Sequence, residues 1–201
     1  MHIFGASGHS KVIIDILKLN GVSISAIWDD NPNIEVFFGF PIAGNLSSIK
    51  NHQVSELIIA IGNNSIRKKV ASELNGPFGR ALHPTSVIAE TATVSSGSVL
   101  MANVVVNADA MIGHHAILNT CCSVDHDCRV SDFVHISPQV GLAGNVEVGE
   151  GTHIGIGASV IQGVKIGKWA TIGAGTVVIR DVPDYAVVVG TPGRIIKYNR
   201  I

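Results

Sequence analysis

Large aliphatic residues recur at every sixth position through the second half of the chain. From Leu82 to Val178, each sixth residue is Leu, Ile or Val, at seventeen successive positions. A helix repeats its apolar side chains at about 3.6 residues, and a half-buried strand repeats them at about 2. A period of six is typical of a hexapeptide β-helix, in which each repeat forms one short strand and one turn.

A second series of small or β-branched residues lies four positions after each aliphatic residue. It reads Ala92, Ser98, Val104, Ala110, Ala116, Cys122, Cys128, Val134, Val140, Val146, Thr152, Ala158, Val164, Ala170, Thr176 and Val182. We expect three hexapeptides to form one triangular coil, with the aliphatic residue filling each side and the small residue packing near the corner. About five stacked coils then form a left-handed parallel β-helix whose aliphatic core offsets much of the ordering entropy.

The first eighty residues do not follow this period. Strands are predicted at 2–4, 23–28 and 56–61, and helices at 11–19 and 66–74, with Ser65 able to cap the second helix. This β-α-β alternation predicts a small α/β Rossmann-like domain over residues 1–80. Residues 81–201 then form the β-helix domain with a C-terminal tail that leaves the column after Pro183 and turns back.

Polar and glycine residues follow the predicted strands of the first domain. The Gly5–Ser10 loop reads GxxG, short of the GxGxxG pattern, so a dinucleotide cofactor is not favoured. Ligands of open α/β sheets bind beyond the carboxyl ends of the strands, where this loop, Asp29-Asp30 and Gly62-Asn63 converge. Loop amides hold phosphates, and an aspartate holds a ribose hydroxyl or a base N–H. The alternative is ordinary turn chemistry, since Gly, Asp and Asn are common turn residues.

The period of six places the histidines of the column outside its core. His126 lies in a turn and His135 in mid-strand, His153 should stack over His135, and His114 and His115 are turn residues that we expect to be exposed. For each one, the alternative is an exposed histidine without function. Asp125 and Asp127 flank His126, and a neighbouring carboxylate raises an imidazole pKa and suits it to general-base chemistry. The sequence does not decide which aspartate pairs with it.

His126 and His135 are predicted on opposite parts of the triangle. His126 lies at a corner and His135 on the side facing that corner, so strand dimensions separate them by on the order of 15 Å. They can share a site only if a second subunit supplies one of them. We therefore expect a homotrimer with active sites between subunits, each pairing His126 of one chain with His135 of its neighbour.

Composition narrows the class of function. A net charge of -1 provides no basic field for nucleic acid, and no apolar run reaches the length of a membrane span. Only 14% of residues are charged, against roughly 25% in an average protein, which fits either buried subunit interfaces or a regular β fold. The start of the chain does not read as a signal peptide, and the three cysteines read as reduced thiols, so a cytoplasmic protein is expected.

Several motifs together resemble those of the hexapeptide acyltransferases, and more narrowly the bacterial sugar acetyltransferases with a Rossmann-like N-terminal domain. That group includes UDP-amino-sugar N-acetyltransferases and sialic acid O-acetyltransferases. The motifs are Gly5-Ala6-Ser7-Gly8-His9, Asp29-Asp30, Ala60-Ile61-Gly62-Asn63-Asn64-Ser65-Ile66-Arg67-Lys68-Lys69, Leu118-Asn119-Thr120, His126-Asp127, Ala143-Gly144-Asn145 and Gly190-Thr191-Pro192-Gly193-Arg194.

The resemblance implies acetyl-CoA as co-substrate, no metal, and a UDP-linked amino sugar as acceptor, of the 4-amino-4,6-dideoxy type. His126 is then the base and Asp127 its acidic partner, with Asp where a relative carries Glu. Contacts to acetyl-CoA are implied for His135, Gly144, Ile156 and Ala174. Contacts to the nucleotide sugar are implied for Gly8, His9, Ser10, Asp29, Asp30 and Gly62.

Three alternatives stay open. O-acetylation of a sugar such as sialic acid uses the same scaffold and the same base. A zinc enzyme of the γ-carbonic anhydrase type needs three imidazoles on one metal, with a histidine pair two coils apart that this sequence lacks. A non-catalytic binding protein is the third, and the outward His126-Asp127 pair argues against it.

Overall fold

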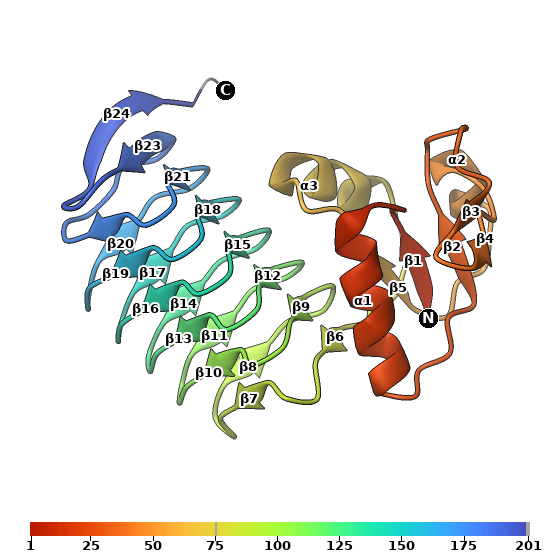
Figure 1. The fold of residues 1–201 in the computed structure, drawn as a ribbon, viewed down its shortest axis with the longest axis horizontal. Coiled ribbons are helices and arrows are strands. Elements are labelled where there is room, and N and C mark those ends of the chain that lie inside the picture. The colour runs from red at the N-terminus through yellow and green to blue at the C-terminus, as the bar shows by residue number, and fades with distance from the viewer. Residues whose placement is uncertain (75, 200–201) are drawn as a thin grey trace.

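The computed structural model describes residues 1–74 and 76–199, and in it the second half of the chain winds into a three-sided column (Figure 1). Each aliphatic residue of the six-residue series ends a two-residue strand, which confirms the predicted period. These strands are β6 (Ala81–Leu82), β7 (Val87–Ile88), β8 (Thr93–Val94), β9 (Val99–Leu100), β10 (Val105–Val106), β11 (Met111–Ile112), β12 (Ile117–Leu118), β13 (Ser123–Val124), β14 (Arg129–Val130), β15 (His135–Ile136), β16 (Gly141–Leu142), β17 (Glu147–Val148), β18 (His153–Ile154), β19 (Ser159–Val160), β20 (Lys165–Ile166), β21 (Thr171–Ile172) and β22 (Val177–Val178).

Parallel pairing between successive coils makes one sheet on each side of the column. The β13 sheet has the order β22-β19-β16-β13-β10-β7, and the β14 sheet has the order β20-β17-β14-β11-β8. The β15 sheet runs β24-β23-β21-β18-β15-β12-β9-β6. Its last two members, β23 (Ala186–Val189) and β24 (Arg194–Tyr198), pair antiparallel, so the chain turns back at the top of the column as predicted.

The interior of the column is aliphatic, as the two residue series predict. Leu100, Leu118 and Ile136 are 0% exposed, and so are small residues such as Ala116 and Cys122. Each buried Leu, Ile or Val contributes roughly 1.5–3 kcal/mol. The turns place their third residue in the left-handed region, where Asn, Asp and Gly are favoured, and Asp127 has a φ of 59° there.

The N-terminal part is a three-stranded parallel sheet of order β2-β1-β5 with helices around it. The strands are β1 (His2–Phe4), β2 (Ala26–Trp28) and β5 (Leu57–Ile59), with a small hairpin of β3 (Val36–Phe37) and β4 (Phe40–Pro41). The helices are α1 (Gly8–Leu19), α2 (Leu46–Lys50) and α3 (Asn64–Glu73). The cap predicted for the last helix is wrong: the Asn63 side chain accepts from the Ile66 N–H, and Ser65 lies inside α3.

Helices α1 and α3 lie on the side of the N-terminal part that faces the column (Figure 1). From α3, the Asn64 amide donates to the carbonyl of Gly151 at 3.0 Å. The Arg67 guanidinium donates to the carbonyls of His115 and Phe133, each at 2.9 Å. Lys68 pairs with Glu150. Polar contacts from one helix thus fix α3 against the corner between the β14 and β15 sheets.

No helix in the described ranges is long and apolar enough to cross a membrane.

Candidate active site

The turn between β13 and β14 presents an imidazole with a carboxylate beside it. His126 is exposed, and its Nδ1 lies 2.8 Å from Oδ2 of Asp127. The Asp125 carboxylate is engaged elsewhere, because Oδ1 accepts from the Asn107 side chain and from the His126 backbone N–H, both at 2.8 Å. Asp127 is therefore the partner of the imidazole, which answers the question that the sequence left open.

Both carboxylates act on the basicity of this imidazole. The pKa of His126 is raised, first by the hydrogen bond to Asp127 and then by the charge of Asp125. The pKa of Asp125 is lowered by the hydrogen bonds from Asn107 and from the His126 backbone, so it stays ionised. A raised pKa makes His126 a stronger proton acceptor than an ordinary histidine.

Gly144 lies one coil above His126 and leaves room for the ring. A Cβ on Gly144 would be 2.6 Å from Cε1 and 2.7 Å from Nε2 of His126. The Asn145 N–H donates to the His126 carbonyl at 2.9 Å, so the two coils are joined at this corner. The nitrogen of His126 that faces away from Asp127 therefore lies against the backbone at Gly144.

His135 lies on the β15 sheet and faces the N-terminal part of the chain. Its ring stacks on that of His153, with centroids 4.9 Å apart and planes at 17°, which confirms the predicted stacking. Nε2 of His135 lies 3.4 Å from the Asn119 amide nitrogen, and Nε2 of His153 lies 2.9 Å from Oγ of Ser137. Burial, and then the charges of His153 and Arg67, lower the pKa of His135 to about 3, so this ring is neutral at pH 7.

Within one chain the two histidines do not meet. His126 lies at the corner that joins the β13 and β14 sheets, and the β15 sheet is the side opposite that corner. The two histidines therefore lie on opposite parts of the triangle, as predicted.

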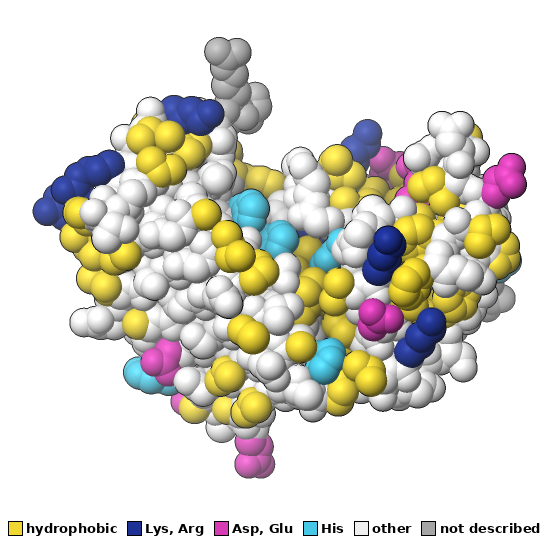
Figure 2. Space-filling model, in the orientation of Figure 1, with side chains coloured by type: hydrophobic (Ala, Val, Ile, Leu, Met, Phe, Trp, Pro, Cys, Tyr) yellow, Lys and Arg dark blue, Asp and Glu magenta, His cyan; other side chains and the backbone are white. Residues whose placement is uncertain are grey.

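A cavity of 630 Å³ lies between the β15 sheet and the loop that follows β5. Gly62 and Asn63 line it from the N-terminal part, and His135, His153 and Trp169 line it from the column. Histidine side chains appear along the surface between the two parts of the molecule (Figure 2). The structure thus brings Gly62, predicted for the sugar site, together with His135, predicted for acetyl-CoA.

The glycine loop before α1 is held by its own polar residues. The buried Ser10 hydroxyl donates to the Gly5 carbonyl at 2.6 Å, and Asp29 accepts the Ala6 N–H at 2.6 Å. Gly8 has open space where a Cβ would lie. Nε2 of His9 is buried and has no hydrogen-bond partner among the described residues, and burial, followed by the charge of Arg67, lowers the pKa of His9 to about 4.

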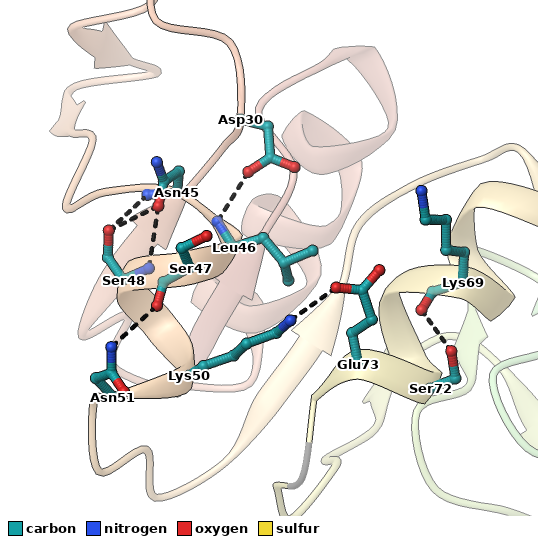
Figure 3. A network of polar contacts seen from close by, with 10 residues as sticks. All are labelled: Asp30, Asn45, Leu46, Ser47, Ser48, Lys50, Asn51, Lys69, Ser72 and Glu73. Atoms are coloured by element: carbon teal, nitrogen blue, oxygen red, sulfur yellow. Dashed lines mark hydrogen bonds and ion pairs between the residues drawn. The ribbon is translucent and has the colours of Figure 1, made fainter.

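Asp30 belongs to a polar network around helix α2 (Figure 3). Its carboxylate accepts the Leu46 N–H at 2.8 Å, at the start of α2. At the other end of α2, Lys50 pairs with Glu73 of α3 at 2.7 Å. Asp29 and Asp30 line a separate cavity of 370 Å³. The side chains of Ser10, Asp29 and Asp30 form hydrogen bonds that hold the loops in place. Their direct contact with a ligand stays a prediction.

Ile156 and Ala174 occupy the corner between the β15 and β13 sheets. Both are exposed, and they lie one coil apart, with the Gly175 N–H donating to the Ile156 carbonyl at 2.8 Å. This corner is the edge of the β15 sheet that lies away from Gly151 and Trp169. The predicted channel for the pantetheine arm would follow it.

One expectation about the histidines is wrong. His115 is 5% exposed and lies against Phe78 and Phe133, with ring centroids 4.5 Å and 5.1 Å apart. Burial, followed by the charge of Arg67, lowers its pKa to about 4. The turn does point His115 away from the column core, but the N-terminal part of the chain covers it there.

The buried Arg67 was not singled out from the sequence. It is 1% exposed and donates to the carbonyls of Ile61, Gly62, His115 and Phe133 and to the side chain of Asn64. Burial lowers the pKa of its guanidinium to about 9. In sequence it sits among lysines on one helix, a pattern typical of a solvated face, so no local signal marks it.

In the described part of the chain, no group of three or more His, Cys, Asp or Glu side chains is placed to hold a metal ion.

Residues 1–74 match the family described as the PglD N-terminal domain, and residues 145–180 match the bacterial transferase hexapeptide family. A GDP-perosamine N-acetyltransferase of Escherichia coli O157:H7 is 30% identical over 156 residues, which cover 73% of this chain and 71% of that protein. The chain spans 50% of a UDP-N-acetylbacillosamine N-acetyltransferase of Bacillus subtilis, at 39% identity, and 24% of a mimivirus protein, at 30% identity.

Solved structures match over nearly the whole chain, and two of them carry a bound co-substrate or product. PerB from Caulobacter crescentus, in complex with CoA and GDP-perosamine, is 38% identical with a TM-score of 0.90, and the match covers 98% of this chain and 96% of that one. The acetyltransferase domain of PglB from Neisseria gonorrhoeae, in complex with acetyl coenzyme A, is 33% identical with a TM-score of 0.90, covering 97% and 98%.

Proposed function

This chain belongs to the family of sugar N-acetyltransferases that join a PglD-type N-terminal domain to hexapeptide repeats, and we propose that it transfers an acetyl group from acetyl-CoA to the amine of a nucleotide-linked amino sugar. This family membership confirms the resemblance that the sequence motifs indicate. The observation that carries the proposal is the exposed His126, 2.8 Å from Asp127 and raised in pKa.

The chemistry follows from that pair. His126 takes a proton from the sugar amine as the nitrogen attacks the thioester carbonyl, and Asp127 stabilises the resulting imidazolium. The carbon–sulfur bond then breaks, and CoA leaves as a thiolate that accepts a proton. General-base catalysis of this kind supplies about 10²–10⁴ in rate. Backbone at Gly144, beside Nε2 of His126, would stabilise the negative charge that develops on the acetyl oxygen.

The active site is proposed to form between subunits of a homotrimer. His126 and the β15 sheet are on opposite parts of one column, so a neighbouring chain would bring its His126 to the cavity that holds His135. Neutral His135 would contact the thioester, while Ile156 and Ala174 would guide the pantetheine arm.

The acceptor is proposed to be a UDP-linked 4-amino-4,6-dideoxy sugar held by the loops after β1, β2 and β5. A GDP-linked amino sugar is the alternative, because GDP-perosamine N-acetyltransferases are among the relatives and one was crystallised with GDP-perosamine. The same base would also serve O-acetylation of a sugar such as sialic acid, but the relatives' activities favour an amine.

A thiol-release assay with acetyl-CoA tests the proposal, using a panel of UDP- and GDP-linked amino sugars together with free and CMP-linked sialic acid. We expect turnover with one of the nucleotide amino sugars, and a loss of about 10²–10⁴ in rate for His126→Ala without loss of the assembly. Turnover confined to sialic acid would replace the amine with a hydroxyl acceptor. Full activity of His126→Ala would remove the base assignment.

A further inference from the structure

The cavity beside His135 has an aromatic wall to which the mechanism above gives no role. Among the described residues that line this cavity, Trp169 is the only Phe, Tyr or Trp. It lies at the corner between the β14 and β15 sheets, two rungs above Phe133 and one above Gly151, and it is partly exposed. A large apolar ring at the edge of a polar cavity is a typical feature of ligand-binding sites.

The position of the Trp169 ring is fixed by its surroundings. Gly151 lies directly below it, where a Cβ would come within 2.4–2.5 Å of three ring atoms. The backbone that carries the ring is also held: the Trp169 backbone N–H donates to the Glu150 carbonyl at 2.7 Å, and the Trp169 backbone carbonyl accepts from the Asn199 side chain at 2.9 Å. Nζ of Lys68 lies 5.4 Å from the ring centroid. The wall is therefore present before any ligand binds, which lowers the entropy cost of binding.

The two edges of the β15 sheet lead to different parts of the proposed site. Ile156 and Ala174 mark the edge assigned to acetyl-CoA, and Trp169 marks the opposite edge, beside the loop after β5. A nucleotide sugar held by that loop would extend its sugar toward His135 along the Trp169 side. The co-substrate and the acceptor would thus approach His135 from opposite edges.

We propose that Trp169 is the surface on which the sugar ring of the acceptor stacks, and that it helps to select that ring; this rests on the proposed function. The C–H groups on one face of a pyranose carry partial positive charge and are attracted to the face of an indole, which carries the negative part of the ring quadrupole. Burying this face also removes apolar area of both partners from water.

Fluorescence tests the stacking directly, because the chain has two tryptophans and Trp28 is 3% exposed in the N-terminal part. Trp28→Phe leaves Trp169 as the reporter, and Trp169→Phe leaves Trp28 as the matched control. We expect GDP-perosamine or a UDP-linked 4-amino-4,6-dideoxy sugar, whichever is acetylated, to change the emission of Trp169 and not that of Trp28. CoA, UDP and GDP alone should leave both unchanged.

Steady-state kinetics provide the second readout. Trp169→Ala should raise the KM for the nucleotide sugar roughly tenfold or more and leave the KM for acetyl-CoA within about twofold, whereas Trp169→Phe keeps a ring and should recover most of the loss. A merely structural role would move both KM values together.

The outcomes separate this inference from the function it rests on. Turnover of an amino sugar without a response from Trp169, or an equal response to the bare nucleotide, overturns the stacking and leaves the function standing. An equal rise in both KM values also overturns it. If none of the amino sugars is acetylated and none changes the emission of Trp169, both proposals fail.

Discussion

Asp127 faces His126 because of where the turn places it. It is the third residue after Val124, and this position takes a left-handed backbone, with a φ of 59° at Asp127. Asp tolerates that conformation better than most residues, because its short side chain bonds locally. The turn then holds the carboxylate 2.8 Å from the imidazole. Asp127 therefore both fits the left-handed position of the turn and pairs with the proposed base.

Replacing the carboxylate should change the pH dependence of the enzyme. A base works in its neutral form, so the wild-type activity falls as the pH drops through the raised pKa of His126. Asp127→Asn removes the first cause of the raised pKa, so the acid limb of kcat/KM should move to lower pH. The weaker base should also lower the plateau rate about tenfold.

The control for this profile is Asp125→Asn. Asp125 raises the pKa of His126 through its charge and not through a side-chain hydrogen bond, so the acid limb should move less. An acid limb that is identical in wild type and Asp127→Asn would show that this pair does not set the titration of the base.

Gly144 should tolerate no side chain. In Gly144→Ala the added methyl would be 2.6 Å from Cε1 of His126, so the imidazole must move off the backbone of the next coil. We expect kcat to fall about 100-fold, as for a misplaced reacting group. Thermal unfolding should change little, because the His126 ring that must move is exposed. Gly141→Ala on the same coil, where a Cβ would be 3.8 Å from Oγ of Ser123, should keep wild-type activity.

At the scale of elements, α3 both lines the cavity and fixes the two parts of the chain together. Asn64, Arg67 and Lys68 recur at helical spacing, so one face of α3 carries these polar contacts to the column. The same guanidinium holds the carbonyls of Ile61 and Gly62 at 2.9 Å and 3.2 Å. The loop that lines the cavity is therefore positioned by the same contact that docks the helix.

Arg67→Met should destabilise the protein strongly. The substitution removes the donors of a buried cluster of carbonyls and leaves them unsatisfied, at a cost of about 3 kcal/mol or more. Arg67→Lys should rescue little, because one ammonium cannot span carbonyls on both sides of the guanidinium. Urea unfolding measures the loss, and Lys69→Met on the exposed face of α3 is the control. A change within about 0.5 kcal/mol for Arg67→Met would contradict this account.

At the scale of the whole molecule, the three-sided column separates two histidines that the proposed mechanism brings together. No bend of one chain brings the corner of His126 to the opposite β15 sheet, because the aliphatic core lies between them. A neighbouring column can do so without any change of fold, and a closed three-fold ring repeats the contact at each interface.

Mixed subunits test the shared site. His126→Ala and His135→Ala should each be inactive alone, yet co-expressed chains should recover activity, because an interface can take His126 from one variant and His135 from the other. Random assembly at equal amounts completes roughly a quarter of the sites, which sets the expected recovery. If mixing restores nothing while mixed trimers form, the two histidines do not act in one intersubunit site.

Much of the fold could be predicted because its signal is local. Each strand of the column pairs with the strand one coil away, so the period of six carries the sheets, the core and the outward positions of His126, His135 and His153. The carboxylates that raise the pKa of His126 are its immediate neighbours in sequence. These features depend only on the spacing of residues along the chain, which can be read from the sequence.

Contacts between distant segments were decided by the tertiary structure alone. Arg67 meets a carbonyl 48 residues away and Asn64 one 87 residues away. Burial of His115 and the placement of Trp169 at the cavity both follow from how the N-terminal part docks. Docking free energy comes from surfaces that match in space, and no periodicity along the chain records that match.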